Sequence, residues 1–181
     1  EADALVASHG SPLYVYDAEI LRRRFRAVQA ALGDRVEISY ALKANPTIAV
    51  ADVLRRAGAS AEVASAGEIH AAIAAGFSGP RIQFAGPGKS RTEIELALRQ
   101  DLARLNIESP AEYTLIAEVS RDLGHRPGVA VRVNPEQAIS GARMHMGGGS
   151  QKFGVDVAQL EGLIRRIVTE DVVELRGLHV Y

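Results

Sequence analysis

Val36-Glu37-Ile38-Ser39-Tyr40-Ala41-Leu42-Lys43 alternates apolar side chains with small or polar ones. In a β-strand, successive side chains point to opposite faces of the sheet. One face of this segment is apolar and suits packing beneath helices: Val36, Ile38, Tyr40 and Leu42. The opposite face ends in Lys43, which needs polar surroundings. We therefore predict a strand over 36–43 with an apolar outer face and a polar inner face.

Similar segments recur along the chain, with longer helical patterns between them. The candidate strands are 36–43, 59–64, 81–85, 103–107, 129–134 and 173–181. Three of the intervening helices begin with a capping box, in which Ser is followed three residues later by Glu. These boxes start at Ser65, Ser90 and Ser109. Strands that alternate with helices predict βαβ units and a parallel sheet.

Polar residues near the ends of these strands indicate how the sheet is arranged. Lys43, Glu62, Arg132 and His179 each lie near the C-terminal end of a candidate strand. In (β/α) barrels those ends meet at one mouth, which holds the active site. We predict an α/β fold of the (β/α)8 TIM-barrel type, present as a partial barrel of about six β/α units. An open doubly wound sheet is the alternative, although no Gly-x-Gly-x-x-Gly follows any candidate strand.

The composition excludes several classes of protein. The 181 residues include 21 Lys and Arg against 22 Asp and Glu, which disfavours nucleic acid as a partner. The absence of cysteine removes disulfides, cysteine-ligated zinc and thiol nucleophiles, and the five scattered histidines predict no metal site. No apolar run approaches the roughly 18 residues of a membrane span, and no signal peptide is recognisable. We expect no membrane partner and a cytoplasmic location.

Lys43 is the residue with the most distinctive chemistry. A lysine late in an apolar strand is partly desolvated, which favours the neutral amine that can form a Schiff base. The alternative is a lysine whose ammonium group simply extends to solvent. Position alone leaves both interpretations open.

The surrounding motif, Tyr40-Ala41-Leu42-Lys43-Ala44-Asn45-Pro46, resembles the cofactor-lysine motif of the fold-type III pyridoxal-phosphate-dependent decarboxylases. That family includes diaminopimelate, arginine and ornithine decarboxylases. Further similar segments follow in the family's order: 11–17, 62–68, 85–89, 132–135, 152–154 and 177–179. The resemblance implies that Lys43 binds pyridoxal 5'-phosphate as a Schiff base. It also implies decarboxylation of an amino acid or an amino-acid-derived substrate.

The resemblance extends to other candidate site residues. Glu62 falls where the family often has aspartate beside the lysine, and Arg132 is similar to the arginine near the cofactor ring. An ordinary ion pair is the alternative for each. Relatives often read Gly-Leu-His-x-His, with the second His stacked on the pyridoxal ring, and here Tyr181 occupies that position. Since His179 and Tyr181 lie two residues apart in a strand, both should face the barrel interior, and either could stack.

Two glycine-containing segments allow more than one interpretation. Lys89 follows Gly86-Pro87-Gly88, which could hold phosphate, but the spacing is not that of a P-loop and favours a turn before Ser90. Residues 141–149 are more similar to decarboxylases of aminoacyl groups held on carrier proteins. Loop composition alone indicates only a glycine-rich loop. We therefore expect a small-molecule amino-acid substrate, either free or linked to a carrier protein.

We expect residues 1–16 to lead into the barrel and residues 17–181 to form the partial pyridoxal-phosphate-binding domain. Relatives have two further β/α units and a C-terminal β-domain that completes the site across a dimer. The resemblance thus implies a C-terminal β-domain absent from this chain, a homodimeric full-length enzyme and an inactive 181-residue piece. Two functions compete with decarboxylation: an amino-acid racemase of the same fold, and a non-catalytic paralogue that only binds the cofactor.

Overall fold

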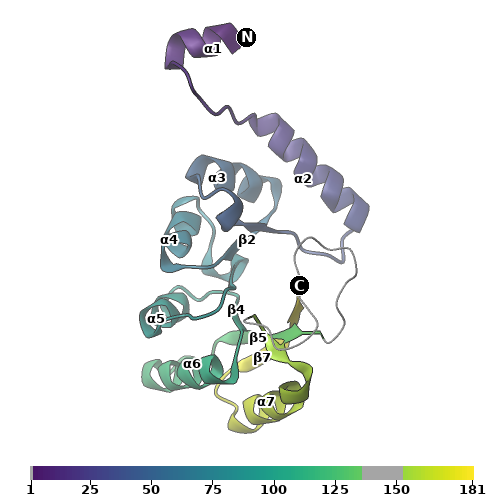
Figure 1. Ribbon diagram of the computed structural model, residues 1–181, viewed down its shortest axis with the longest axis vertical. Coiled ribbons are helices and arrows are strands. Elements are labelled where there is room, and N and C mark those ends of the chain that lie inside the picture. The colour runs from purple at the N-terminus through teal and green to yellow at the C-terminus, as the bar shows by residue number, and fades with distance from the viewer. Residues whose placement is uncertain (1, 136–152) are drawn as a thin grey trace.

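The computed structural model describes residues 2–135 and 153–181 (Figure 1). Seven strands form one sheet in the order β1-β2-β3-β4-β5-β6, with β7 also paired to β5, and every pairing is parallel. The strands are β1 Ser39–Ala41, β2 Ser60–Val63, β3 Ile82–Phe84, β4 Arg104–Ile107, β5 Gly128–Asn134, β6 Val155–Asp156 and β7 Glu174–Val180. Parallel strands joined by helices confirm the predicted βαβ units.

Most of the helices lie on one side of this sheet. Their bounds are α1 Ala2–His9, α2 Ala18–Leu32, η1 Leu42–Ala44, α3 Ile48–Ala57, α4 Ala66–Ala74, η2 Gly79–Arg81, α5 Arg91–Arg99, α6 Pro110–Leu123 and α7 Val157–Glu170. Figure 1 shows α3, α4, α5, α6 and α7 in a curved row on one side of the strands. This arrangement is a partial barrel, with its helices outside, as predicted. The division at residues 16 and 17 stays a prediction.

The core lies between the strands and this row of helices. The apolar outer residues of the strands are almost completely buried: Ala61, Val63, Phe84, Leu105, Ile107, Val129 and Val131. Ile94, Ile116 and Ile167 pack in the same cluster from three helices. The alternation of apolar and polar residues therefore placed the outer face of the sheet correctly.

The first predicted strand is too long. Only Ser39–Ala41 pairs with β2, and Lys43 lies in the short helix η1 rather than in a strand. The chain turns there because the Tyr40 hydroxyl donates to the carbonyl of Asn45 at 2.9 Å, while Asn45 Oδ1 accepts from the Thr47 N–H at 3.0 Å. Pro46 also keeps Asn45 extended, which prevents η1 from continuing as a helix. The two-residue strand β6 was not predicted.

The three predicted capping boxes differ in detail. All three serines accept from the N–H of the glutamate three residues on, but the reciprocal bond is present only at Ser90. The other two glutamates accept from the residue before the serine, with Glu68 bonding the Ala64 N–H at 2.8 Å and Glu112 the Glu108 N–H at 2.7 Å. These carboxylates thus fix the loops that follow β2 and β4, at the C-terminal ends of the strands.

In the part of the chain that the structure describes, no helix has both the length and the apolar character needed to cross a bilayer. Over the same residues, no group of three or more His, Cys, Asp or Glu side chains is arranged to hold a metal ion.

Candidate active site

Lys43 and Glu62 form an ion pair at the C-terminal ends of β1 and β2. The strand register aligns Ala41 with Glu62, so a lysine two residues beyond Ala41 reaches over the neighbouring strand. Lys43 Nζ donates to Glu62 Oε1 at 3.2 Å. The lysine side chain is 62% exposed and that of Glu62 only 22%. The amine is therefore accessible from the barrel mouth, with a carboxylate placed to hold its proton.

Arg132 lies on β5 and is held by a carboxylate that sequence reasoning missed. Its Nη1 donates to both oxygens of Glu108, at 3.0 and 3.2 Å. The Glu108 side chain is 3% exposed and that of Arg132 11%. The guanidinium also lies against two aromatic rings, with its Cζ 5.1 Å from the ring centre of Phe153 and 5.9 Å from that of Tyr181. Arg132 is thus held in place on several sides at once.

β7 places His179 beside this pair. His179 aligns with Arg132 in the parallel pairing of β5 and β7, so both residues lie on the inner face. Burial, and then the positive charge of Arg132, lower the pKa of His179, while Glu62 and Glu108 partly oppose this change. Its Nδ1 is buried and has no hydrogen-bond partner among the described residues. The site therefore contains an imidazole whose pKa is lowered and whose buried Nδ1 has no partner among the described residues.

Lys89 lies outside this site, in a buried structural position. Its side chain is 1% exposed, and Nζ donates to the carbonyls of Gly86 at 2.8 Å and Asn106 at 2.6 Å and to Glu112 Oε1 at 3.2 Å. Burial lowers the pKa of Lys89, and the charge of Glu112 opposes that shift. Because an ammonium group has three N–H donors, none remains for a phosphate. The geometry thus supports the predicted structural turn before Ser90.

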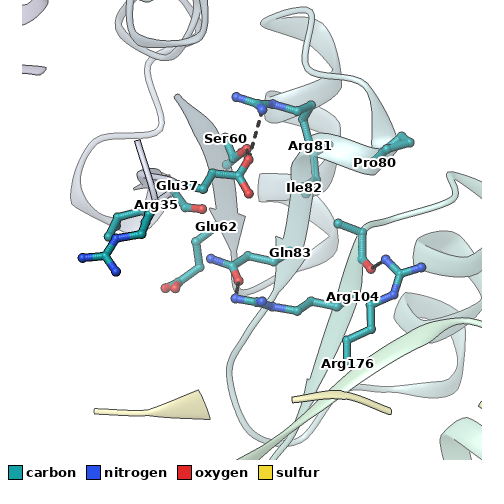
Figure 2. A pocket seen from close by; sticks show the side chains of 14 residues that line it. Arg35, Glu37, Ser60, Glu62, Pro80, Arg81, Ile82, Gln83, Arg104 and Arg176 are labelled. Atoms are coloured by element: carbon teal, nitrogen blue, oxygen red, sulfur yellow. Dashed lines mark hydrogen bonds and ion pairs between the residues drawn. The ribbon is translucent and has the colours of Figure 1, made fainter. Parts of the chain in front are cut away.

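The inner face of the sheet is polar below the barrel mouth. A hollow of about 680 Å³ lies on this face, lined by side chains from β2, β3, β4 and β7. Figure 2 shows four of them, Glu62, Gln83, Arg104 and Arg176. Arg104 donates to Gln83 on the neighbouring strand, and Arg176 donates to the Ala103 carbonyl at 2.6 Å. Glu62 lines this hollow and also pairs with Lys43. The prediction of a polar inner face is confirmed.

The structure shows a parallel barrel segment with an accessible lysine beside a carboxylate, and with an arginine and a histidine on the same inner face. This is the arrangement that the resemblance to pyridoxal-phosphate-dependent barrels implied. Comparison with known proteins gives the family. The family model described as "Pyridoxal-dependent decarboxylase, pyridoxal binding domain" matches residues 18–181, and the chain belongs to this family. The predicted family, fold and pyridoxal cofactor are therefore confirmed.

Individual relatives agree with this assignment. The chain is 33% identical over its whole length to an L-glutamyl-[BtrI acyl-carrier protein] decarboxylase of Niallia circulans. It is 31% identical, over 98% of its length, to a diaminopimelate decarboxylase of Bacillus subtilis. The chain spans 42% of each of these relatives. The structure of diaminopimelate decarboxylase from Helicobacter pylori, complexed with L-lysine, superimposes with a TM-score of 0.90 at 29% identity and covers 99% of this chain and 46% of that one.

The structure brings together Lys43 with Glu62, and Arg132 with His179 and Tyr181, as the sequence predicted. Their catalytic and cofactor-binding roles stay predictions. Residues 141–149, which suggested a carrier-linked substrate, lie outside the described residues. The missed residue, Glu108, had one sequence signal, because it is an acidic side chain directly after a candidate strand.

Proposed function

We propose that this protein takes part in the decarboxylation of an amino acid, with Lys43 as the residue that binds pyridoxal 5'-phosphate. The observation that carries the proposal is the accessible Lys43 amine, 3.2 Å from the Glu62 carboxylate in a pyridoxal binding domain. When bound, the cofactor supplies an aldehyde that captures amines and a ring that accepts the electron pair left by carbon dioxide.

The described residues fit this cofactor. Lys43 presents an exposed primary amine to an aldehyde, and Glu62 is within reach of the proton on Nζ. His179 lies level with Arg132 on the inner face, where its ring is placed beside a ligand bound there. Arg132 supplies a fixed positive charge there. His179 and Tyr181 are the two candidates for stacking on the cofactor ring.

The substrate class has two candidates. A free amino acid fits the relatives named diaminopimelate decarboxylase. An aminoacyl group on a carrier protein is the second candidate, because the relative that acts on such a substrate matches all 181 residues. A panel of free amino acids, tested beside the same residues attached to a carrier protein, distinguishes them.

Decarboxylation is preferred to the two competing functions because the relatives named above are decarboxylases. A racemase would invert the α-carbon and release no carbon dioxide. A non-catalytic paralogue would bind the cofactor and turn over neither substrate. The proposal includes a homodimer, which light scattering or sedimentation of the protein encoded by the complete gene would test.

The central experiment identifies the lysine that binds the cofactor. In the protein encoded by the complete gene, borohydride reduction in the presence of pyridoxal phosphate, followed by mass spectrometry, identifies the modified lysine. The 181 residues contain three candidates, Lys43, Lys89 and Lys152. We expect the pyridoxyl group on Lys43, its loss in Lys43→Arg and its retention in the matched control Lys152→Arg. Labelling of another lysine, unchanged in Lys43→Arg, would remove Lys43 from the proposed role.

A further inference from the structure

Glu108 lies directly after β4, and all the described groups that bond its nearly buried carboxylate are donors. Oε1 accepts from the Gly86 N–H at 3.3 Å, and Oε2 accepts from the Gly154 N–H at 3.0 Å. Arg132 Nη1 donates to both oxygens. A buried carboxylate with this set of partners ties together three segments of the barrel mouth: the loop after β3, strand β5 and the residues before β6.

A second buried ion pair, between Lys89 and Glu112, fixes the backbone of Glu108. Glu112 Oε2 accepts from the Glu108 N–H at 2.7 Å, and Glu112 Oε1 lies 3.2 Å from Lys89 Nζ. The Glu112 side chain is 5% exposed and that of Lys89 1%. The backbone of Glu108 is therefore fixed by groups that do not reach the mouth, while its side chain faces Arg132.

The segment at Gly154 packs closely on Arg132. Gly154 has a φ of +79°, and a Cβ at this position would lie 3.1 Å from the Arg132 carbonyl oxygen. The same segment places the Phe153 ring 5.1 Å from the guanidinium. The hydrogen bond from the Gly154 N–H to Glu108 therefore fixes the position of one of the rings that flank Arg132.

We propose that Glu108 is a positioning residue, which sets the orientation of the Arg132 guanidinium and acts on the cofactor site through it. This inference rests on the proposed function. The position needs two acceptor oxygens, because each described group that bonds the Glu108 side chain is a donor. Glutamine has a similar shape, but its amide nitrogen would confront either Arg132 or a backbone N–H with a second donor.

The test compares Glu108→Gln, Arg132→Met and the double variant in the protein encoded by the complete gene. The measurements are the kcat/KM for carbon dioxide release and the Kd for pyridoxal phosphate from absorbance titration, at a temperature where all variants are folded. We expect each single variant to lose more than about tenfold in kcat/KM, equivalent to ~1.4 kcal/mol. The double variant should lose no more than Arg132→Met alone, because Glu108 acts through that residue.

Glu93→Gln is the matched control. Glu93, in the first turn of α5, also accepts from two backbone N–H groups, those of Ser90 and Ala66, but it is not paired with an arginine among the described residues. The kcat/KM of Glu93→Gln should stay within about twofold of wild type. When Glu93→Gln is combined with Arg132→Met, the fold losses in kcat/KM of the two single variants should multiply. If Glu108 were merely structural, the fold losses in kcat/KM of Glu108→Gln and Arg132→Met would also multiply in the double variant. That result would overturn the proposal.

Two further measurements distinguish failure of the positioning role of Glu108 from failure of the proposed function. If the wild-type protein neither binds pyridoxal phosphate nor releases carbon dioxide, the proposed function fails. The arginine orientation is then read from the 15N side-chain NMR signal of Arg132, and an unchanged signal in Glu108→Gln would overturn the positioning role. If Glu108→Gln does not fold, Glu108→Asp takes its place, since it keeps the charge but shortens the reach. Wild-type kcat/KM in Glu108→Asp would also refute the inference.

Discussion

Replacing Lys89 by methionine should destabilise the protein far more than any exposed ion pair would suggest. Lys89→Met keeps an apolar side chain of similar length but removes the donor to Gly86 O, Asn106 O and Glu112 Oε1. Glu112 would retain its two backbone donors, yet its buried charge would lose the only counter-charge paired with it in the described structure. Removing one partner of a buried ion pair costs about 3–5 kcal/mol.

Thermal unfolding followed by circular dichroism measures this effect. For a chain of this size about 1 kcal/mol shifts the midpoint by roughly 2–4 °C, so Lys89→Met should lower the midpoint by about 6–20 °C. Arg165→Met is the matched control, because Arg165 pairs with Glu161 at 2.7 Å with both side chains 77% exposed. An exposed pair at this spacing contributes about 0.3–0.5 kcal/mol, so the control should change the midpoint by no more than about 2 °C.

The opposite pattern would refute the structural role of Lys89. If Lys89→Met changed the free energy of unfolding by less than about 1 kcal/mol and weakened pyridoxal phosphate binding, Lys89 would be a ligand for the phosphate. The three bonds seen at Nζ would then have to break on binding.

Three further predictions follow from single residues and from the chain length. Because burial lowers the pKa of His179, the unfolded chain binds a proton more readily, and stability should fall as the pH drops below about 6.5. His179→Asn should weaken this dependence of the thermal midpoint between about pH 7.5 and 5.5, whereas parallel curves for both proteins would contradict it. Gly154→Ala should cost about 1–3 kcal/mol in urea unfolding, because of its φ of +79° and the close Arg132 carbonyl, while Gly162→Ala in α7, which has open space, should be neutral or stabilising. The 181-residue chain alone, which spans 42% of its relatives, should bind pyridoxal phosphate weakly in an absorbance titration and release no carbon dioxide.

The sequence predicted the sheet well where alternation and burial act together. Val63, Leu105 and Val131 are fully buried on the outer face, and the strands that contain them were found. The alternating pattern wrongly predicted a strand at Leu42, which is also buried but lies in η1. A buried residue in a strand and one in a tight turn give the same apolar signal. What ends β1 is a set of hydrogen bonds around Asn45, and these depend on the folded geometry.

The site was predicted where one residue carries its own signal. Lys43 was identified by the family motif around it, and Arg132 by the same resemblance and because a guanidinium on an inner strand face needs a partner. Glu108 has the same placement but lies directly before a Ser-Pro helix start, where an acidic residue is ordinary. Its role appears only when its partners are known.

Those partners are set by the register between successive β/α units. Leu105 pairs with Val129 and Ile107 with Val131, so Glu108 comes level with Arg132 one residue beyond the last aligned pair. A shift of one residue would turn Arg132 to the outer face and leave both charges buried without partners. The alternating pattern specifies the two faces of each strand. It is preserved, however, whenever β5 is shifted along β4 by an even number of residues. The ion pair of Glu108 with Arg132 distinguishes among those shifts, because only one of them brings the two charges together. The same contact that orients the arginine therefore also favours the observed register of β4 and β5.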